Sequence, residues 1–554
     1  MSNPSNTLRT LTVIVMLVIA AYLLIGGVWL IVLGGSIYYV IAALLLFASA
    51  FLLKQRQSSA LWLYSLLMLA TILWSLWEVG TDFWALAPRL DILGILGLWM
   101  LIPAVTRNMS AVQSSKIALS GTLLIAICVM VYAIFNDPQE INGVIKQPQP
   151  ESVQAIDGIA EQDWPAYGRT QAGVRYSPLT QINDKNVKDL KVVWTFRTGD
   201  VKTDQDSGET TNQVTPIKVG DNLYMCTTHQ WLIALDPASG QEKWRYDPKL
   251  KADHTFQHLT CRGVMYYDAN NTAEFATSLQ SRKTISAECP RKVIVPVNDG
   301  RLVAVNADTG KVCSDFGEQG EVNLQKFMPY AYPGGYNPTS PGVISGTTIV
   351  IAGSVTDNYS SKEPSGVIRG YDVNTGELLW VFDTGAQNPN AMPNESTTFV
   401  HNSPNAWAPL AYDAKLDIVY VPTGVGTPDI WGGDRSELKE RYANSMLAIN
   451  ASTGKLVWHF QTTHHDLWDM DVPAQPSLAD VQNAAGQTVP AIYVLTKTGN
   501  VFVLDRRTGK AIVPITERAV PQAVKRGRQT QGEHYAATQP FSALNFAPQE
   551  KLDR

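Results

Sequence analysis

The chain is poor in charged residues and in cysteine, and it carries no excess of positive charge. Lys, Arg, Asp and Glu make up 17% of its 554 residues, whereas an ordinary soluble domain has about 25%. The formal net charge is −5, so the chain as a whole lacks the basic surface typical of a nucleic-acid-binding protein. Five cysteines are too few for us to expect a disulfide framework to hold the fold together.

The shortage of charge is concentrated in residues 11–136, which are mostly apolar. A helix needs about 20 apolar residues to cross a bilayer. Five segments are expected to do so: Leu11–Leu33, Ile37–Leu53, Ala60–Leu76, Ile92–Val105 and Ile117–Phe135. A buried soluble bundle would need polar helix faces, and a cleaved signal peptide would not be followed by further spans. The sequence therefore predicts a five-span helical membrane anchor over residues 1–136.

The positions of Lys and Arg around these segments predict the orientation of the anchor. One set of ends carries Arg9, Lys54, Arg56, Arg107 and Lys116, whereas the opposite loops carry only Arg89. Because short cytoplasmic loops hold the excess of Lys and Arg, we expect the N-terminus inside. Five spans then place everything after about Asn136 outside the inner membrane of a bacterium, in the periplasm.

Two charged residues, Arg89 and Asp91, are expected at the outer mouth of the fourth span. Charge so close to hydrocarbon is often functional. Two interpretations are open: an interfacial anchor that also uses Trp84, or a polar clamp for the head group of a membrane quinone. Residues 137–162, with Pro138, Pro148 and Pro150 among polar residues, are predicted to be a linker.

A turn pattern recurs in the remaining residues, 163–554. Five copies of an Asp- or Asn-initiated turn end in glycine, at Gly240, Gly310, Gly376, Gly454 and Gly509, with spacings of 70, 66, 78 and 55 residues. Asp or Asn starts such a turn, and glycine supplies the positive φ at its end. Three copies are followed by a tryptophan, Trp244, Trp380 or Trp458, which could pack flat between neighbouring units.

Repeated strand-rich units of this kind predict a β-propeller or a solenoid rather than unrelated hairpins in a β-sandwich. The spacing exceeds the roughly 40–45 residues of a bare four-stranded blade. We therefore expect long inserted loops, and long loops on a rigid scaffold commonly carry the functional site.

The Asp-Thr-Gly turn followed by tryptophan resembles the docking repeat of the quinoprotein alcohol dehydrogenases. Two longer stretches, residues 163–179 and the His464-His-Asp-Leu-Trp-Asp-Met-Asp-Val-Pro-Ala-Gln-Pro476 segment, make the resemblance closer. With the apolar segments ahead of them, the chain resembles the membrane-bound sugar dehydrogenases of that family, which use pyrroloquinoline quinone (PQQ). No Cys-x-x-Cys-His motif occurs, so a haem-carrying relative is not expected.

This resemblance implies an all-β propeller of eight blades over residues 163–554, of which only about five repeats are present. It implies that roughly the last third of the catalytic domain is not in this sequence. An unclosed ring would leave sheet edges bare, and we expect the 554-residue chain alone to bind its cofactor weakly and to oxidise little sugar.

The residues that could remove a hydroxyl proton from an alcohol are Asp466, Asp469 and Asp471, and all three could instead simply form turns. The family motif matches the base to Asp469, directly after Trp468. A carboxylate suits this step if its position and pKa are tuned.

The metal expected from the resemblance is Ca²⁺ or Mg²⁺, both of which prefer carboxylate and carbonyl oxygens. Asp357 and Asn358 match the family's metal position, although Asp-Asn after a strand is also a common turn. Thr427 falls where the alcohol-oxidising relatives have an asparagine ligand.

The cofactor is a flat tricarboxylate, which requires an aromatic surface and cations. The resemblance assigns Trp407 to stacking, Lys497 to the quinone oxygens and Arg262 to a cofactor carboxylate. His258 falls where soluble relatives have a disulfide lid of adjacent cysteines, and Gln213 takes the place of a family glutamate.

Three functions remain open at this stage. The first is oxidation of an aldose, such as D-glucose to glucono-1,5-lactone, with transfer of electrons to ubiquinone in the membrane. The second is oxidation of quinate or another polyol by the same machinery. The third is a non-catalytic membrane-tethered propeller scaffold, which should lack Asp469, Lys497 and Trp407 as a set. The sequence does not indicate an oligomeric state.

Overall fold

The computed structural model describes residues 4–144, 155–156, 159–206, 209–251, 255–270, 288–433, 435–482, 485–522 and 533–546. The chain divides into two compact units, Met1–Gly143 with Val192–Thr195, and Val144–Lys191 with Phe196–Arg554. The predicted linker, residues 137–162, spans the boundary between them, and its Pro148 and Pro150 lie outside the described residues.

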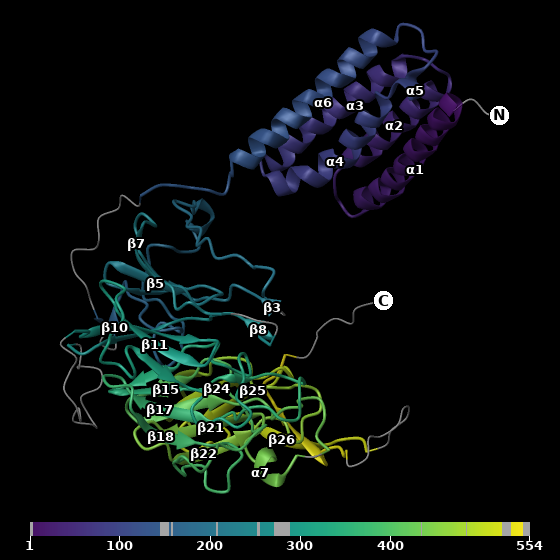
Figure 1. Ribbon diagram of the computed structural model, residues 1–554. Coiled ribbons are helices and arrows are strands. Elements are labelled where there is room, and N and C mark those ends of the chain that lie inside the picture. The colour runs from purple at the N-terminus through teal and green to yellow at the C-terminus, as the bar shows by residue number, and fades with distance from the viewer. Residues whose placement is uncertain are drawn as a thin grey trace. The chain divides into compact units, whose positions relative to one another are not determined.

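The first unit is helical (Figure 1) and consists of α1 (Pro4–Val32), α2 (Tyr38–Lys54), α3 (Ser59–Val79), α4 (Phe83–Met100), α5 (Pro103–Thr106) and α6 (Val112–Phe135). All five apolar segments predicted from the sequence are thus helical. Four helices, α1, α3, α4 and α6, are long and apolar enough to cross a membrane, and α2 is a shorter apolar helix of 17 residues. At 1.5 Å per residue α2 is about 26 Å long, slightly less than the roughly 30 Å of a hydrocarbon core.

The fourth helix differs from its predicted bounds, Ile92–Val105. Helix α4 begins at Phe83 because the Asp82 carboxylate caps it, accepting a hydrogen bond from the Ala85 N–H at 3.1 Å. It ends at Met100, and Pro103 starts the separate short helix α5. Arg89 and Asp91 therefore lie within α4 rather than in front of it.

Contacts between helix ends define the two ends of the helical unit. Arg9 Nε donates to the Val105 carbonyl at 2.9 Å, and Arg56 donates to Asn6 at 3.3 Å. At the other end, Asn136 donates to Thr81 and Gln139 to Asp82. The basic residues of α1, α2 and the α5 region thus share one end, and the chain leaves α6 at the opposite end.

The second unit consists mainly of antiparallel sheets that follow one another along the chain (Figure 1). Blade 1 contains β4 (Ile217–Val219), β5 (Asn222–Cys226), β6 (Leu232–Leu235) and β7 (Glu242–Tyr246). Blade 2 contains β9 (Met265–Asp268), β10 (Arg291–Val297), β11 (Arg301–Asn306) and β12 (Glu321–Asn323). Blade 3 contains β14 (Val343–Ser345), β15 (Thr348–Ile351), β17 (Ile368–Asp372) and β18 (Leu378–Phe382). Blade 4 contains β19 (Ala411–Asp413), β20 (Ile418–Pro422), β21 (Ser445–Asn450) and β22 (Leu456–Gln461). Blade 5 has three strands, β23 (Ser477–Gln482), β24 (Thr488–Leu495) and β25 (Val501–Asp505).

Shorter elements complete the described part of this unit. Four two-stranded pairs join β1 (Ala155–Ile156) with β2 (Ile159–Ala160), β3 (Glu209–Thr210) with β8 (His258–Leu259), β13 (Tyr336–Asn337) with β16 (Ser354–Val355), and β26 (Ile515–Ala519) with β27 (Thr538–Ser542). A 3₁₀ turn η1 (Val187–Asp189) and a short helix α7 (Glu437–Glu440) are also present.

The hydrophobic core lies between consecutive blades. Separate apolar clusters join blade 1 to blade 2, blade 2 to blade 3, blade 3 to blade 4 and blade 4 to blade 5. The sheets of blades 2, 3 and 4 therefore bury both faces against their neighbours, as the repeat pattern requires of a propeller.

The tryptophans after the turns pack between blades as predicted. Three indole N–H groups donate to carbonyls in the turn of the next blade: Trp244 to Ala307 at 3.0 Å, Trp380 to Ala451 at 2.9 Å and Trp458 to Arg506 at 3.0 Å. The turn glycines have φ near +70°, and a Cβ added at Gly310, Gly454 or Gly509 would lie within 2.7 Å of the indole ring. The glycines are thus required both by the turn and by the flat contact.

The junction between blades 2 and 3 is built differently, because no tryptophan follows the turn that ends at Gly310. There the Gly317 N–H donates to the Thr375 carbonyl at 2.9 Å, and Gly376 packs against the Gly317 backbone.

Two disulfides, Cys226–Cys261 and Cys289–Cys313, lie in blades 1 and 2. A disulfide framework was not expected, and these two bridges, which pair four of the five cysteines, were not predicted. The number of cysteines alone does not show which of them pair, since the partners are 35 and 24 residues apart and meet only when the strands pair.

Candidate active site

The strand order of the blades sends particular loops to one end of the second unit. Within an antiparallel blade, the turn between the third and fourth strands lies at one end, and that end carries the repeated glycine turns. The connections from one blade to the next, and those between second and third strands, lie at the opposite end. Residues far apart in the sequence can therefore converge there.

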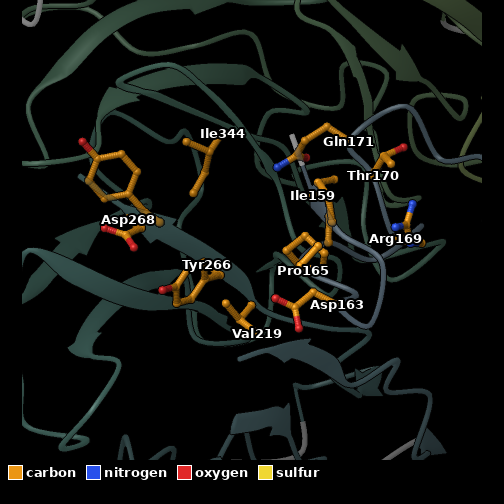
Figure 2. A pocket seen from close by; sticks show the side chains of 13 residues that line it. Ile159, Asp163, Pro165, Arg169, Thr170, Gln171, Val219, Tyr266, Asp268 and Ile344 are labelled. Carbon is orange, nitrogen blue, oxygen red and sulfur yellow. The ribbon is translucent and has the colours of Figure 1, made fainter. Parts of the chain in front are cut away.

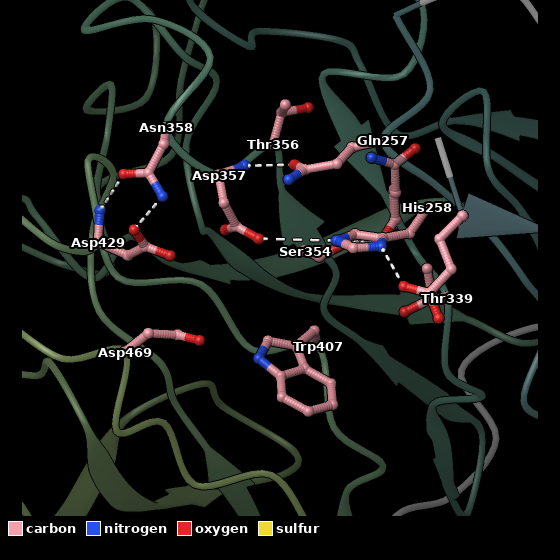
Figure 3. A network of polar contacts seen from close by, with 12 residues as sticks. Gln257, His258, Thr339, Ser354, Thr356, Asp357, Asn358, Trp407, Asp429 and Asp469 are labelled. Carbon is pink, nitrogen blue, oxygen red and sulfur yellow. Dashed lines mark hydrogen bonds and ion pairs between the residues drawn. The ribbon is translucent and has the colours of Figure 1, made fainter. Parts of the chain in front are cut away.

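A cavity of about 350 Å³ is formed by these loops (Figure 3). The residues that line it are Glu209, Thr211, Gln213, Gln257, His258, Thr260, Arg262, Thr339, Ser354, Asp357, Asn358, Trp407, Asp429, Asp469, Asp471 and Lys497. The cavity thus includes Asp469 and every predicted cofactor residue, together with two of the three predicted metal ligands. Thr427 is not part of its lining.

The aromatic surface is provided by Trp407, from the connection between β18 and β19. The Arg262 guanidinium lies 5.1 Å from the centre of the indole ring, and Lys497 Nζ lies 5.9 Å from it. Arg262 also donates to Thr339 Oγ1 at 2.5 Å, and burial lowers its pKa. The cavity thus offers one aromatic face with two cations beside it, as a flat polyanionic ligand requires.

Lys497 bridges two carboxylates at one side of the cavity. Its Nζ donates to Asp469 Oδ2 and to the Asp469 carbonyl, both at 2.8 Å, and lies 3.4 Å from Asp471 Oδ2. Burial alone would lower the pKa of Lys497, but the negative charges of Asp471 and Asp469 outweigh it and raise that pKa. Lys497 is therefore held as an ammonium ion next to Asp469.

Asp469 is held in an uncommon backbone conformation, with φ of +57°, and non-glycine residues in this region often mark functional sites. The neighbouring Trp468 is 76% exposed. Asp469 projects into the cavity near Trp407 (Figure 3), where a carboxylate can accept a proton from a bound hydroxyl group.

Asp466, another of the three candidate bases, has a structural position. It is 2% exposed and accepts hydrogen bonds from the backbone N–H groups of Trp468 and Met470 and from the Asn444 side chain. Burial raises its pKa. Asp466 thus shapes the turn that presents Asp469 and does not line the cavity.

Oxygen donors gather at the other side of the cavity, in the β16–β17 and β20–β21 connections. Asn358 donates to the Asp429 carboxylate, and the Asp429 N–H donates to Asn358 Oδ1 at 3.2 Å (Figure 3). Burial, followed by the nearby charges of Asp357 and Asp469, raises the pKa of Asp429 despite its bond to Asn358. Carboxylate and amide oxygens brought together in this way suit Ca²⁺ or Mg²⁺.

Thr427 lies apart from this group. Its Oγ1 and its carbonyl both accept hydrogen bonds from the Asn402 side chain at 2.9 Å, and it is buried. Its assignment as a metal ligand stays a prediction that the cavity lining does not favour.

His258 connects the donors to the first blade. Its imidazole lies 3.8 Å from Asp357 Oδ2 and 3.3 Å from Glu209 Oε2. The nearby Asp357 carboxylate raises the pKa of His258, against the effect of burial. The Asp357 N–H donates to Gln257 at 2.8 Å, whereas Gln213 is exposed and donates to Thr211 at 3.1 Å.

Sequence reasoning missed Glu209, Gln257, Thr339 and Asp429 as cavity residues, and it considered Asp471 only as an alternative base or a turn residue. Glu209 reaches the site because β3 pairs in parallel with β8, which carries His258. No local pattern marks such a pairing. Asp429, in contrast, belongs to the glycine-rich loop that also holds Thr427, so that loop was a detectable signal.

A second cavity of about 220 Å³ lies against the first strands of blades 1, 2 and 3 (Figure 2). Asp163, Arg169, Val219, Tyr266 and Ile344 are among its lining residues. None of the predicted site residues lines it, so the first cavity is the candidate active site.

In the helical unit, Arg89 and Asp91 lie within α4 and have separate partners. Arg89 forms an ion pair with Glu78 at 2.9 Å and lies 5.7 Å from the centre of the Trp74 ring. The Asp91 carboxylate accepts from the Ile92 N–H at 2.5 Å. A quinone clamp made of these two residues remains a prediction.

The fold and the site together define a PQQ-type dehydrogenase domain. A family model described as the beta-propeller domain of PQQ glucose/ethanol/alcohol dehydrogenases matches residues 164–554, and the chain belongs to this family.

Individual members of this family are similar to the chain over most of its length. Quinoprotein glucose dehydrogenase A of Acinetobacter calcoaceticus is 80% identical over 503 residues, which cover 91% of this chain and 63% of that protein. Quinoprotein glucose dehydrogenase of Escherichia coli (strain K12) is 57% identical over 504 residues, covering 91% and 62%. Quinate/shikimate dehydrogenase (quinone) of Acinetobacter baylyi is 37% identical over 504 residues, covering 89% and 61%. The chain thus spans a little under two thirds of the length of these relatives.

Proposed function

We propose that this chain is the anchor and catalytic-site portion of a membrane-bound quinoprotein that oxidises an aldose, D-glucose to glucono-1,5-lactone, and passes the electrons to ubiquinone. The convergence of Asp469, Lys497, Trp407 and Arg262 in one cavity carries the proposal. The 80% identity to a quinoprotein glucose dehydrogenase supports the sugar as substrate.

The cavity has the donors that PQQ would need. Trp407 offers a face for its rings, Arg262 offers a cation for a carboxylate, and Lys497 can donate to a quinone oxygen. When bound, PQQ supplies an electrophilic quinone that accepts a hydride equivalent from the alcohol carbon. Ca²⁺ or Mg²⁺ would be held by oxygens of Asp357, Asn358 and Asp429 and would polarise that quinone.

The proposed step at the protein is removal of the substrate hydroxyl proton by Asp469. The ammonium of Lys497 lies 2.8 Å from Asp469 Oδ2 and helps to hold that side chain in the cavity. His258 and Glu209 line the same cavity and would contact the remaining hydroxyl groups of the sugar.

Oxidation of quinate or another polyol is the second candidate. The 37% identity to a quinate/shikimate dehydrogenase favours it less than the 80% identity favours glucose. A scaffold function is disfavoured, because a scaffold does not require a base, a lysine and an aromatic surface in one cavity.

Substitution of Asp469 by Asn tests the proposed base. Asn keeps the shape and an oxygen but cannot accept the proton, and general-base catalysis is worth about 10²–10⁴-fold. In a chain extended to the length of the glucose dehydrogenase relatives, with PQQ and Ca²⁺ or Mg²⁺ added, glucose oxidation measured with an artificial electron acceptor should fall by at least about 10²-fold in kcat. The matched control is Asp466→Asn, in the same loop but outside the cavity, which should retain most of its turnover. Near-normal turnover by Asp469→Asn would contradict the assignment.

We propose that the helical unit spans the bacterial inner membrane with the N-terminus in the cytoplasm and the second unit in the periplasm. The common end of Arg9, Arg56 and the α5 region supports this orientation. Reporter fusions after Lys54 or Arg107 should be active only as cytoplasmic reporters, and a fusion after Asn142 only as a periplasmic one. A cytoplasmic signal from the Asn142 fusion would overturn both the span count and the orientation.

A further inference from the structure

The carboxylate of Asp471 joins three separate loops beneath the cavity. Its Oδ2 accepts from Trp407 Nε1 at 2.9 Å and lies 3.4 Å from Lys497 Nζ, while its Oδ1 accepts from the Val425 N–H at 3.1 Å. These partners come from the β18–β19, β24–β25 and β20–β21 connections. One side chain therefore links three loops at the site.

The space around this carboxylate leaves it little freedom. Asp471 is 7% exposed, and a Cβ added at Gly424 would lie only 2.4 Å from its Oδ1. A buried carboxylate is costly unless its oxygens are bonded, and here both oxygens have donors. A glutamate at this position would be too long for the same three contacts.

We propose that Asp471 is a positioning residue that sets the plane of the Trp407 indole and the place of the Lys497 ammonium. The bond to Nε1 fixes the edge of the indole, so that its face is presented beside Arg262 and Lys497. This inference deepens the proposed function and depends on it, because the surface so positioned is the one that PQQ would occupy.

The arrangement also explains how Lys497 can keep its place during a reaction. Lys497 has two carboxylate partners, Asp469 at 2.8 Å and Asp471 at 3.4 Å. When Asp469 accepts the substrate proton, it loses its charge. Burial raises the pKa of Asp471 to about 7, so above that pH Asp471 remains as the anionic partner that holds Lys497 in place.

The first test needs no cofactor. The full 554-residue chain is treated with an amine-acylating reagent at pH 8, and acylation of Lys497 is measured by mass spectrometry relative to the exposed Lys249. Two carboxylates raise the pKa of Lys497, so Asp471→Asn should lower that pKa and increase the relative rate at least about threefold. The matched control is Asp413→Asn, which breaks another buried carboxylate–cation pair, with Arg506 at 2.6 Å, and should leave the rate unchanged.

The second test measures binding of PQQ by quenching of tryptophan fluorescence. Asp471→Asn should weaken binding at least about tenfold, a loss typical of a charged hydrogen-bonded partner. Trp407→Phe keeps a ring but removes the N–H, and the double variant should bind PQQ scarcely more weakly than the weaker single variant, because both changes break the same link.

The outcomes separate the two proposals. An unchanged Lys497 acylation rate in Asp471→Asn, or fully additive losses in the double variant, would overturn the positioning role. If Asp471→Asn does not fold, the rate of Lys497 acylation in Trp407→Phe is the deciding measurement. Without its bond to the indole, Asp471 should hold Lys497 less firmly, so the rate should increase. An unchanged rate would count against the positioning role. Absence of PQQ binding by the unaltered chain would count against the proposed function, and the acylation result would still test Asp471.

Discussion

Substitution of Gly454 by alanine should destabilise the propeller unit through the contact between blades 3 and 4. Gly454 has φ of +71°, and an added Cβ would lie 2.6 Å from atoms of the Trp380 ring. The left-handed backbone costs an alanine about 1–2 kcal/mol. Displacing the ring adds about 1–3 kcal/mol of overpacking and about 0.5–1.5 kcal/mol for the hydrogen bond from Trp380 to Ala451. The total is about 2.5–6.5 kcal/mol.

Gly486 provides the matched control for this prediction. It has a nearly identical φ of +76°, but nothing lies within 4 Å of an added Cβ. Gly486→Ala should therefore lose only the backbone contribution of about 1–2 kcal/mol. Urea unfolding of both variants, followed by tryptophan fluorescence, should show the larger loss for Gly454→Ala. Equal shifts in the two midpoints would refute the view that glycine is needed there for tryptophan docking.

Two further predictions concern stability. His229 lies between Asp200 and Asp206, with 3.1 Å to Asp206 Oδ1, and the bond to Asp200 raises the pKa of His229 from 6.5 to about 9. The raised pKa means that this stabilisation is complete below about pH 6.5 and is lost as the pH rises to 9. It amounts to at most about 3 kcal/mol, so His229→Gln should flatten the fall in melting temperature between pH 6.5 and 9, and an unchanged slope would contradict the assignment. The Cys226–Cys261 disulfide closes a loop of 35 residues and should contribute up to about 4 kcal/mol. The Cys226→Ser/Cys261→Ser variant should melt at a lower temperature and bind PQQ less tightly, because Cys261 adjoins Arg262, and identical melting curves would exclude a stabilising role.

Much of the architecture was predictable, because it depends on local patterns that repeat. The Asp-to-Gly turns, the position of Trp380 after its turn and the apolar helices each have a signal within about ten residues. The start of α4 was missed because a single cap, Asp82, outweighs the polar appearance of the segment around Arg89. The disulfide between Cys226 and Cys261 was missed because no local pattern specifies which cysteines will meet.

Some residues of the candidate site were likewise predictable from the sequence, whereas others depend on contacts of the folded chain. The resemblance predicted Asp469, Trp407 and Lys497 as site residues, and the structure brings these into one cavity. Glu209 and Asp429 could not be placed in the same way. Their positions follow from the pairing of β3 with β8 and from the packing of Asn358 against Asp429, both of which are properties of the folded chain.

The loops that form the cavity come from every one of the five described blades. Ligand binding therefore depends on the stability of blades 1 to 5 together. A ligand held at once by Arg262, Trp407 and Lys497 can bind only while blades 1 to 5 keep their spacing. Its binding free energy is then added to the free energy of unfolding, by about 2.7 kcal/mol at a hundredfold excess over its dissociation constant. A substitution that weakens a distant blade junction, such as that of Trp380 with Gly454, should thus lower the affinity for the cofactor. An excess of cofactor should in turn restore part of the lost stability.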